Sequence, residues 1–292
     1  MEHAASRYFV PASSHWPLLG SFAMFLLMLG ASLLLNDQSV VGGYSAGLGF
    51  LLFVAMLFGW FGSVIAESRG GNYNDQVDAS FRWGMGWFIF SEVMFFAAFF
   101  GALFYARHFV VPWLGGIGAK PLTHELLWPT FSAAWPLLQL PAPEHFTVAK
   151  EAMAAAGLPA MNTAILLSSG ATVTWAHWCM TSNRRRQLIV ALACTVALGV
   201  LFLGLQAYEY GDAYTLKNLR LTSGIYGSTF YMLTGFHGAH VTIGAIMLSV
   251  ILIRTMLGHF TPTQHFAFEA VSWYWHFVDV VWLGLFVFVY LL

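Results

Sequence analysis

Charged side chains are scarce in this sequence. Asp, Glu, Lys and Arg make up 9% of its 292 residues, whereas an average soluble domain carries about 25%. Hydrophobic residues make up 59% and aromatic residues 17%, which is more than one water-soluble globule can bury. The formal net charge of −1 gives no basic surface for nucleic acid. These values exclude soluble, disordered and nucleic-acid-binding proteins and favour a polytopic membrane protein.

Cysteine is also scarce. The two cysteines, Cys179 and Cys194, form no Cys-x-x-Cys pair and no cluster with histidine. A disulfide framework, a zinc site and a cysteine-ligated copper centre therefore lose support. The sequence also lacks the phosphate-binding pattern Gly-x-x-x-x-Gly-Lys-Ser/Thr. From the residues alone we expect a chain with no metal site of its own.

Long apolar runs are what the sequence has instead. Each is about 20 residues long, enough to cross a hydrocarbon core of about 30 Å as a helix. The runs are continuous, whereas the strands of a membrane barrel alternate over about ten residues. The sequence therefore predicts an all-α polytopic membrane protein with seven transmembrane helices, over residues 18–35, 46–66, 83–106, 160–180, 188–208, 228–253 and 270–291.

Basic residues between the runs predict the orientation, because cytoplasmic loops are enriched in Lys and Arg. The N-terminal side carries seven of them: Arg7, Arg69, Arg82, Arg184, Arg185, Arg186 and Arg254. Short segments on the other side carry three: Arg107, Lys217 and Arg220. We expect a cytoplasmic (or matrix) N-terminus, a C-terminus on the opposite side and no removable signal. The run Arg184–Arg186 is either a topology anchor or an anionic-lipid site.

The segment 109–159 is rich in proline and too interrupted to span a membrane. We predict a surface loop with a short helix near residues 146–156, capped by Thr147. A loop of this length is either an interaction surface or a dispensable elaboration, and the sequence does not choose between them.

Glu92 lies about nine residues into the third run, within FIFSEVMFFAAFF. An ionisable group at membrane depth costs roughly 2.5–3.5 kcal/mol and usually faces protein, water or a partner. Its neighbours along the helix are Met, Phe and Ile, so the charged form is disfavoured and we expect a neutral carboxyl at pH 7. Two interpretations stay open: a proton-handling or lipid-adjacent carboxylate, or a hydrogen-bonded structural residue.

Other polar groups lie at a similar depth. Asp279 in the seventh run has His276 three residues before it, on the same helical face, so the two can satisfy each other. His237 and His240 lie in the sixth run, whose small residues indicate an interior helix. Helix rise places His240 within one turn of the level of Glu92. We therefore predict a hydrogen bond from Glu92 to His237 or His240, direct or through water.

These histidines fit a haem site poorly. A membrane b-type cytochrome needs axial histidines on opposed helices, and His237 and His240 share one helix. His177, near the end of the fourth run, is typical of a helix-end histidine. The alternatives are a single haem, a His-plus-carboxylate metal site or a proton-coupled transporter. A transporter would need discontinuous helices, and these runs lack mid-helix proline. None of these residues by itself gives a reaction.

Five blocks, in order, resemble the cytochrome c oxidase subunit III family. They are FRWGMGWFIFSEVMFF (81–96), TVTWAHW (172–178), LQAYEY (205–210), GSTFYMLTGFHGAHVTIGA (227–245) and HFAFEAVSWYWHFVDVVWLGLFVFVY (265–290). The resemblance covers residues 60–292, and residues 1–60 agree in hydropathy only.

The resemblance implies a seven-helix accessory subunit of a proton-pumping haem–copper oxidase. Helices one and two (1–66) would splay from a bundle of helices three to seven (67–292), leaving a V-shaped cleft filled with phospholipid. The chain would pack on subunit I, with subunit II in the same complex. Haem and copper would belong to those partner subunits, and cytochrome c would donate the electrons. The chain would support proton uptake and stabilise the active site during O₂ reduction.

The resemblance also implies roles for particular residues. The family's buried, carbodiimide-reactive glutamate matches Glu92. Glu67, Arg82, Arg254 and His259 become candidate contacts for lipid head groups. The sequence departs from the mitochondrial members where GGNYND (70–75) replaces a His-His pair and where Ala66 replaces an arginine, which affects those lipid contacts.

Some loops, including the segment 109–159, are longer than those of the mitochondrial members. This difference favours a bacterial plasma membrane over a mitochondrial inner membrane. An accessory subunit of a quinol oxidase or of a nitric oxide reductase is the alternative within the superfamily.

Overall fold

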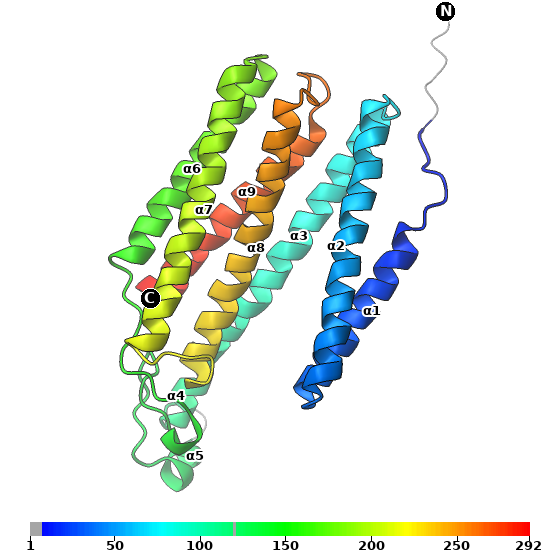
Figure 1. Ribbon diagram of the computed structural model, residues 1–292. Coiled ribbons are helices and arrows are strands. Elements are labelled where there is room, and N and C mark those ends of the chain that lie inside the picture. The colour runs from blue at the N-terminus through cyan, green and yellow to red at the C-terminus, as the bar shows by residue number, and fades with distance from the viewer. Residues whose placement is uncertain (1–7, 119–120) are drawn as a thin grey trace, which may run out of the picture. The chain divides into compact units, whose positions relative to one another are not determined.

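The protein is described from a computed structural model that covers residues 8–118 and 121–292. Helices make up its regular structure, and no strand occurs in those residues (Figure 1). The long helices are α1 (Trp16–Leu35), α2 (Ser39–Arg69), α3 (Asp75–Tyr105), α6 (Leu158–Thr181), α7 (Arg185–Thr215), α8 (Gly224–Met256) and α9 (Phe266–Leu285). The short ones are η1 (Ala106–Val110), α4 (Val111–Leu114), α5 (Pro121–Leu127), η2 (Pro143–His145) and η3 (Phe286–Leu291).

Six of the described helices are long and apolar enough to cross a membrane: 16–35, 39–69, 75–114, 185–215, 224–256 and 266–291. The chain is therefore an integral membrane protein. The remaining predicted span, 160–180, forms α6, but α6 is not among these six. Its hydroxyl side chains lower its hydropathy, and several bond to its own backbone; Thr163 and Thr174, for example, donate to the carbonyls of Pro159 and Gly170.

The chain divides into two compact units, one ending at Trp83 and the other beginning at Gly84. The predicted boundary between residues 66 and 67 stays a prediction. In the first unit, α1 and α2 pack closely through glycine. A Cβ on Gly30 would lie 2.4 Å from the backbone nitrogen of Ala46, so only glycine fits there. The Trp16 indole donates to Ser63 Oγ at 3.2 Å and joins the two helices at one end.

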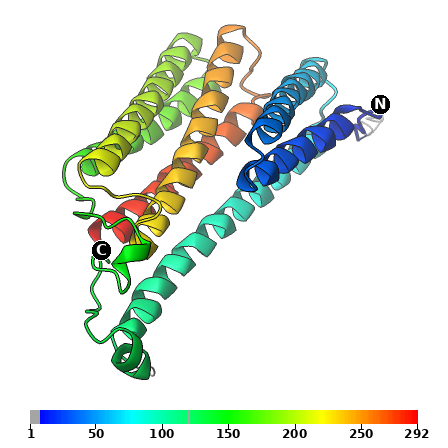
Figure 2. The same ribbon diagram turned by 60° about the horizontal axis from the view of Figure 1, so that its bottom comes forward.

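The second unit is built around α6, α7, α8 and α9, which lie side by side in sequence order, with α9 also contacting α6 (Figures 1 and 2). Its largest buried side chains include Trp275 and Trp282 of α9 and Phe202 of α7. Each indole nitrogen finds a hydroxyl on α6: Trp275 donates to Ser169 at 2.9 Å and Trp282 to Thr163 at 2.9 Å. The hydroxyls that make α6 less apolar thus also bond the buried tryptophans of α9.

The part of α3 that belongs to the second unit packs on α8 and α9 through aromatic rings. Phe96 contacts His240 of α8 and Phe277 of α9, with ring centroids 5.0 and 6.1 Å apart. Phe95 contacts Phe236 of α8 edge to face at 5.0 Å. Large rings keep the backbone of α3 farther from α8 and α9 than glycine keeps α1 from α2. This spacing leaves room for the Glu92 side chain between α3 and α8.

The predicted helix near residues 146–156 was wrong. That stretch has no helix, and the loop's helical turns are α5 and η2. Thr147 caps nothing; its Oγ1 shares a hydrogen bond of 2.9 Å with Thr222 Oγ1. The predicted loop start at residue 109 was also wrong, because η1 and α4 continue the helix to Leu114 despite Pro112. Proline is tolerated at the start of a helical turn, which is where Pro112 lies.

The loop is anchored to the bundle. Phe131, Leu137 and Met153 are buried in the common core, and the Met153 amide donates to Tyr226 Oη at 3.0 Å. At the surface, Lys217 Nζ donates to the Glu151 carboxylate at 2.8 Å and holds the pKa of that carboxyl below its usual range. The loop is therefore part of the folded unit.

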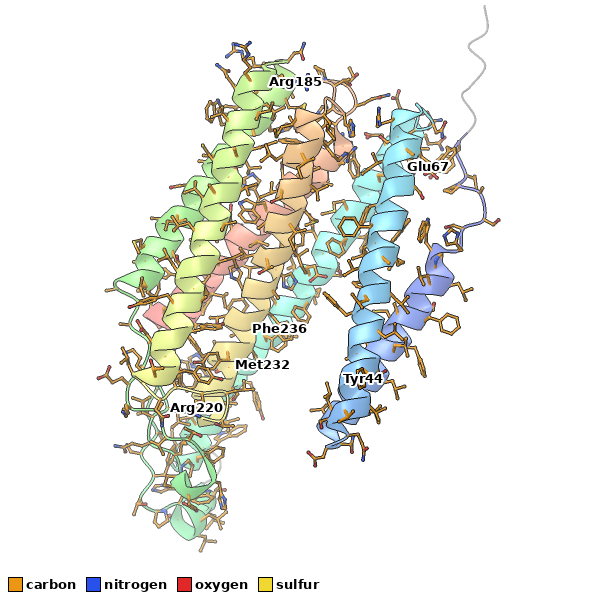
Figure 3. The ribbon with its side chains drawn as sticks, viewed as in Figure 1. Tyr44, Glu67, Arg185, Arg220, Met232 and Phe236 are labelled. Atoms are coloured by element: carbon orange, nitrogen blue, oxygen red, sulfur yellow. The ribbon has the colours of Figure 1, made fainter. Side chains whose placement is uncertain are left out.

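Basic side chains mark both ends of the second unit. Arg185 lies at the start of α7, and Arg220 lies in the connection between α7 and α8, at opposite ends of that helix pair (Figure 3). Arg184, Arg186 and Arg254 belong to the Arg185 end, whereas Lys217 belongs to the Arg220 end. The Arg185 guanidinium donates to the carbonyl of Met256 at 2.8 Å and so fixes the end of α8.

Candidate functional site

Glu92 of α3 and His240 of α8, which are 148 residues apart in sequence, form a hydrogen-bonded pair between the two helices. Glu92 Oε2 lies 2.8 Å from His240 Nε2, which confirms the predicted bond and selects His240 over His237. The Glu92 side chain is 22% exposed and that of His240 13%. Phe95 and Phe96 flank the imidazole. A polar pair thus lies among aromatic rings.

The hydrogen bonds of His240 fix the number of protons in this pair. Its Nδ1 lies 2.6 Å from the carbonyl of Phe236, and a carbonyl only accepts, so Nδ1 carries a proton. One further proton lies between Nε2 and Glu92 Oε2. Whether that proton is on the carboxyl or on the imidazole, the pair has no net charge. This agrees with the small cost of burying it in an apolar place.

His237 lies one turn earlier on α8 and has a separate environment. Its side chain is 1% exposed, and its Nε2 donates to the carbonyl of Val278 at 3.2 Å. The ring lies between Phe202 and Trp282, with centroids 5.8 and 5.1 Å away. His237 therefore joins α8 to α9 and does not contact Glu92.

His276 and Asp279 lie together on α9, as their spacing predicted, with Nδ1 and Oδ2 3.6 Å apart. The carboxylate also faces α6. A Cβ on Gly170 would meet Asp279 Oδ2, so a larger residue there would push the carboxylate away from α6. His276 Nε2 lies 3.3 Å from Thr174 Oγ1. The pair thus joins α9 to α6 and lies apart from the contact of Glu92 with His240.

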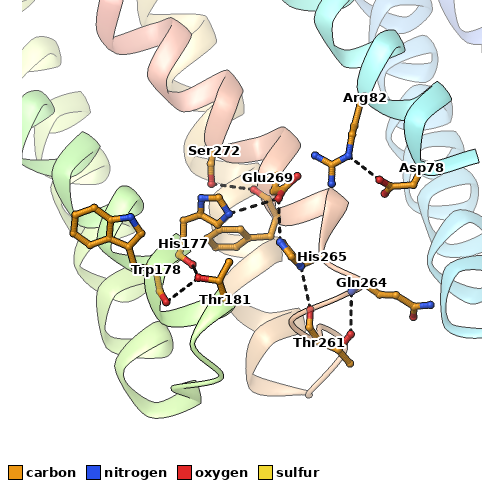
Figure 4. Close-up of polar contacts among 11 residues, drawn as sticks. Asp78, Arg82, His177, Trp178, Thr181, Thr261, Gln264, His265, Glu269 and Ser272 are labelled. Carbon is orange, nitrogen blue, oxygen red and sulfur yellow. Dashed lines mark hydrogen bonds and ion pairs between the residues drawn. The ribbon is translucent and has the colours of Figure 1, made fainter. Parts of the chain in front are cut away.

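Two of the lipid-headgroup candidates lie in the first unit. Glu67, near the end of α2 (Figure 3), accepts a hydrogen bond from Tyr73 Oη at 2.8 Å. Burial, and then this bond to Glu67, raises the pKa of Tyr73, which therefore stays protonated and keeps donating at physiological pH. Arg82 donates to Asp78 at 2.7 Å one turn earlier on α3 (Figure 4).

The other two candidates follow α8 in the second unit. The Arg254 guanidinium lies over the ring of Phe260 at 4.5 Å, and the backbone amide of His259 donates to the Arg254 carbonyl at 3.0 Å. Both residues lie at the end of the second unit where α7 begins with Arg185. Their roles toward lipid stay predictions.

The sequence analysis missed a cluster made by His177, His265 and Glu269 (Figure 4). Glu269 Oε1 lies 3.0 Å from His265 Nε2 and 3.5 Å from His177 Nε2. His177 comes from α6, whereas His265 and Glu269 lie at the start of α9. The four-residue spacing of His265 and Glu269 was a usable signal, but nothing in the sequence indicated that His177 joins them.

Gln206 and Glu209, in the block LQAYEY, were missed as well. Both are buried on α7, at 5% and 1% exposure. Nearby on α7, Tyr210 shares a hydrogen bond of 2.7 Å with Thr234 of α8. Both residues lie near the end of an apolar run, where side chains are often at the membrane surface. Their position in the sequence therefore gave no reason to expect that they are buried.

The fold and these contacts define a class: a polytopic helical membrane protein whose intramembrane carboxylates contact histidines of the same chain. Comparison with known proteins is more specific. The family model described as cytochrome c oxidase subunit III matches residues 6–139 and 124–292. The chain therefore belongs to the cytochrome c oxidase subunit III family, whose members are subunits of an oxidoreductase complex.

Individual relatives agree over nearly the whole chain. "Cytochrome c oxidase subunit 3" of Formosania lacustris is 40% identical over 291 residues, 99% of this chain and 98% of that protein. The protein of the same name from Danio rerio is 39% identical with the same coverage. That of Prototheca wickerhamii is 42% identical over 280 residues, covering 95% and 94% of the two chains.

Proposed function

We propose that this chain is a non-catalytic accessory subunit of a proton-pumping cytochrome c oxidase. It packs on subunit I in a complex that also contains subunit II. Those partners hold haem and copper, and cytochrome c supplies the electrons. The chain acts by covering a flank of subunit I and holding phospholipid there, which supports proton uptake and stabilises the active site during O₂ reduction.

The hydrogen bonds of His240 are the observation that best supports the non-catalytic role. Both of its nitrogens have partners, Glu92 and the Phe236 carbonyl, and His237 uses Nε2 to join α8 to α9. Turning the His240 ring toward an iron would break both bonds and leave buried polar groups unpaired, which costs about 1–3 kcal/mol. We therefore infer that His240 supports the packing of α8 against α3 and is not a redox ligand.

Apolar surface supports the contact with lipid and with subunit I. Phe25 of α1, Phe58 of α2 and Trp87 of α3 are 63%, 78% and 66% exposed, and such surface is stable only against lipid or another protein. We further propose that α6 crosses the membrane as a seventh span, since several of its hydroxyls bond to its own backbone. The lipid-filled V-shaped cleft and the head-group roles of Glu67, Arg82, Arg254 and His259 belong to the same proposal.

The proposed orientation follows from the arginines at the Arg185 end of the second unit, which favour the cytoplasmic side. With seven spans, the N-terminus faces the cytoplasm (or matrix) and the C-terminus the periplasm (or intermembrane space). We propose a bacterial plasma membrane as the location, from the loop lengths noted above.

Purification of the native complex through a tag on this chain tests the function. We expect haem and copper to copurify and the complex to oxidise reduced cytochrome c with uptake of O₂. The measurements are an optical spectrum, metal analysis and an oxygen electrode. A tagged complex without haem would contradict the proposal, and turnover with quinol but not with cytochrome c would show the alternative quinol oxidase.

Substitution of Glu92 tests its role. We expect Glu92→Gln to keep O₂ reduction within about twofold of the native rate, a change of about 0.4 kcal/mol in activation free energy. The amide N–H can donate to His240 Nε2 in place of the shared proton. Glu92→Leu removes that partner and should destabilise the chain by about 1–3 kcal/mol. Loss of turnover in an intact Glu92→Gln complex would contradict an accessory role.

A further inference from the structure

We propose that His177, His265 and Glu269 form a binding site for one divalent cation of the zinc type. Among the residues the structure describes, this is the one group of three His, Cys, Asp or Glu side chains whose ligand atoms all lie within 4.8 Å of one another. The group lies where α6 ends and α9 begins (Figure 4). This site revises the expectation of no metal site and is separate from the pair formed by Glu92 and His240.

The distances are close to those of a tetrahedral zinc site. Zinc binds histidine nitrogen at about 2.0–2.1 Å and carboxylate oxygen at about 2.0–2.2 Å, which places neighbouring tetrahedral ligand atoms about 3.3 Å apart. Glu269 Oε1 lies 3.0 Å from His265 Nε2 and 3.5 Å from His177 Nε2. Small side-chain rotations bring the three atoms around one ion.

His265 is already oriented as a metal ligand. Its Nδ1 lies 3.1 Å from the carbonyl of Thr261, which can only accept, so Nδ1 carries a proton. Nε2 faces Glu269 Oε1 at 3.0 Å, and a metal ion would take the place of the proton that these two atoms share, because metal binding releases ligand protons. A histidine that binds metal through one nitrogen while the other donates to a carbonyl is the usual arrangement in metal sites.

The other two ligands are also held in position. Glu269 lies in the first turn of α9, where the helix dipole favours a negative charge. His177 packs against the ring of Phe268, with centroids 5.9 Å apart. The His177 side chain is 40% exposed, whereas those of His265 and Glu269 are 10% and 12% exposed. An ion can therefore enter beside His177, and solvent can supply a fourth ligand.

The donor set selects the kind of cation. Two imidazoles and one carboxylate with an open position are typical of zinc and of similar transition metals, whereas Mg²⁺ and Ca²⁺ prefer oxygen ligands throughout. A bound ion would link the end of α6 to the start of α9, although His177 and His265 are 88 residues apart in sequence. We infer a site for Zn²⁺ that excludes Mg²⁺.

The test uses the purified complex, stripped with a chelator and then equilibrated with zinc chloride. We expect an anomalous-scattering or density peak at the zinc edge between the three side chains. In equilibrium dialysis, His177→Ala and Glu269→Gln should each raise the dissociation constant of one bound zinc ion by more than about 10-fold. Even changes to residues around the ligands of a metal site lower metal affinity by about 10–100-fold. Magnesium chloride should give no peak there.

His145→Ala is the matched control, because it removes an exposed histidine outside the cluster, whose side chain is 76% exposed. This variant should bind zinc as the native complex does. The peak in the native complex requires no variant to fold. If no zinc lies between His177, His265 and Glu269 at saturating concentration, the proposal is wrong, whatever zinc other subunits bind.

Discussion

Removal of this chain from the purified oxidase is expected to leave initial O₂ reduction active but to slow proton uptake severalfold and to shorten the catalytic lifetime. The proposed role requires this, because haem and copper stay in the partner subunits while the covered flank of subunit I loses its protein and lipid. The rate of proton uptake at one haem transition and the number of turnovers before inactivation are the two measurements.

Reconstitution provides the control for that experiment. Adding the chain back with phospholipid should restore both the uptake rate and the lifetime, whereas adding phospholipid alone should restore neither in full. A depleted oxidase with a native lifetime would contradict the proposed function. Complete loss of O₂ reduction at the first turnover would instead indicate that the chain has a direct catalytic role.

Replacement of Trp275 with alanine is expected to cause the largest loss of stability. The indole is fully buried, with an exposure of 0%, and its nitrogen donates to Ser169 Oγ on α6. A Cβ on Gly199 of α7 or on Gly244 of α8 would lie 2.8 Å from an indole carbon. Trp275 thus contacts three other helices, and packing rather than water drives helix association in membranes. Trp275→Ala should therefore cost about 3–5 kcal/mol.

Trp273→Ala is the matched control on the same helix. Trp273 is 36% exposed, and we expect its loss to change stability by about 0.5 kcal/mol. The measurement is the thermal denaturation of this chain within the purified complex, followed for both variants and the native protein. Equal destabilisation by the two variants would contradict the packing role assigned to Trp275.

The contact between Glu92 and His240 could be predicted because helix rise is constant. Counting residues along two apolar runs placed both groups within one turn of the same depth, and burial required a partner for each. The choice between His237 and His240 could not be made in this way. It depends on how α8 is rotated about its axis, which packing against α3 and α9 determines.

The loop between α4 and α6 was predicted less well. Thr147 is a good capping residue, but its hydroxyl bonds to Thr222, and Met153 lies in the core of the second unit. Local sequence preferences are weak, so contacts with a distant segment override them. The helical continuation to Leu114 was missed because Pro112 was interpreted as a stop, whereas it lies in the first turn of α4.

The sequence by itself determined that the chain is helical, lies in a membrane and places ionisable groups inside it, since length and hydropathy are local properties. Only the tertiary structure decided which of those groups meet. It brought His177 of α6 to His265 and Glu269 of α9, and Asp279 of α9 to Gly170 of α6. Such meetings depend on helix rotation and on small residues at crossing points, which act between segments far apart in the chain.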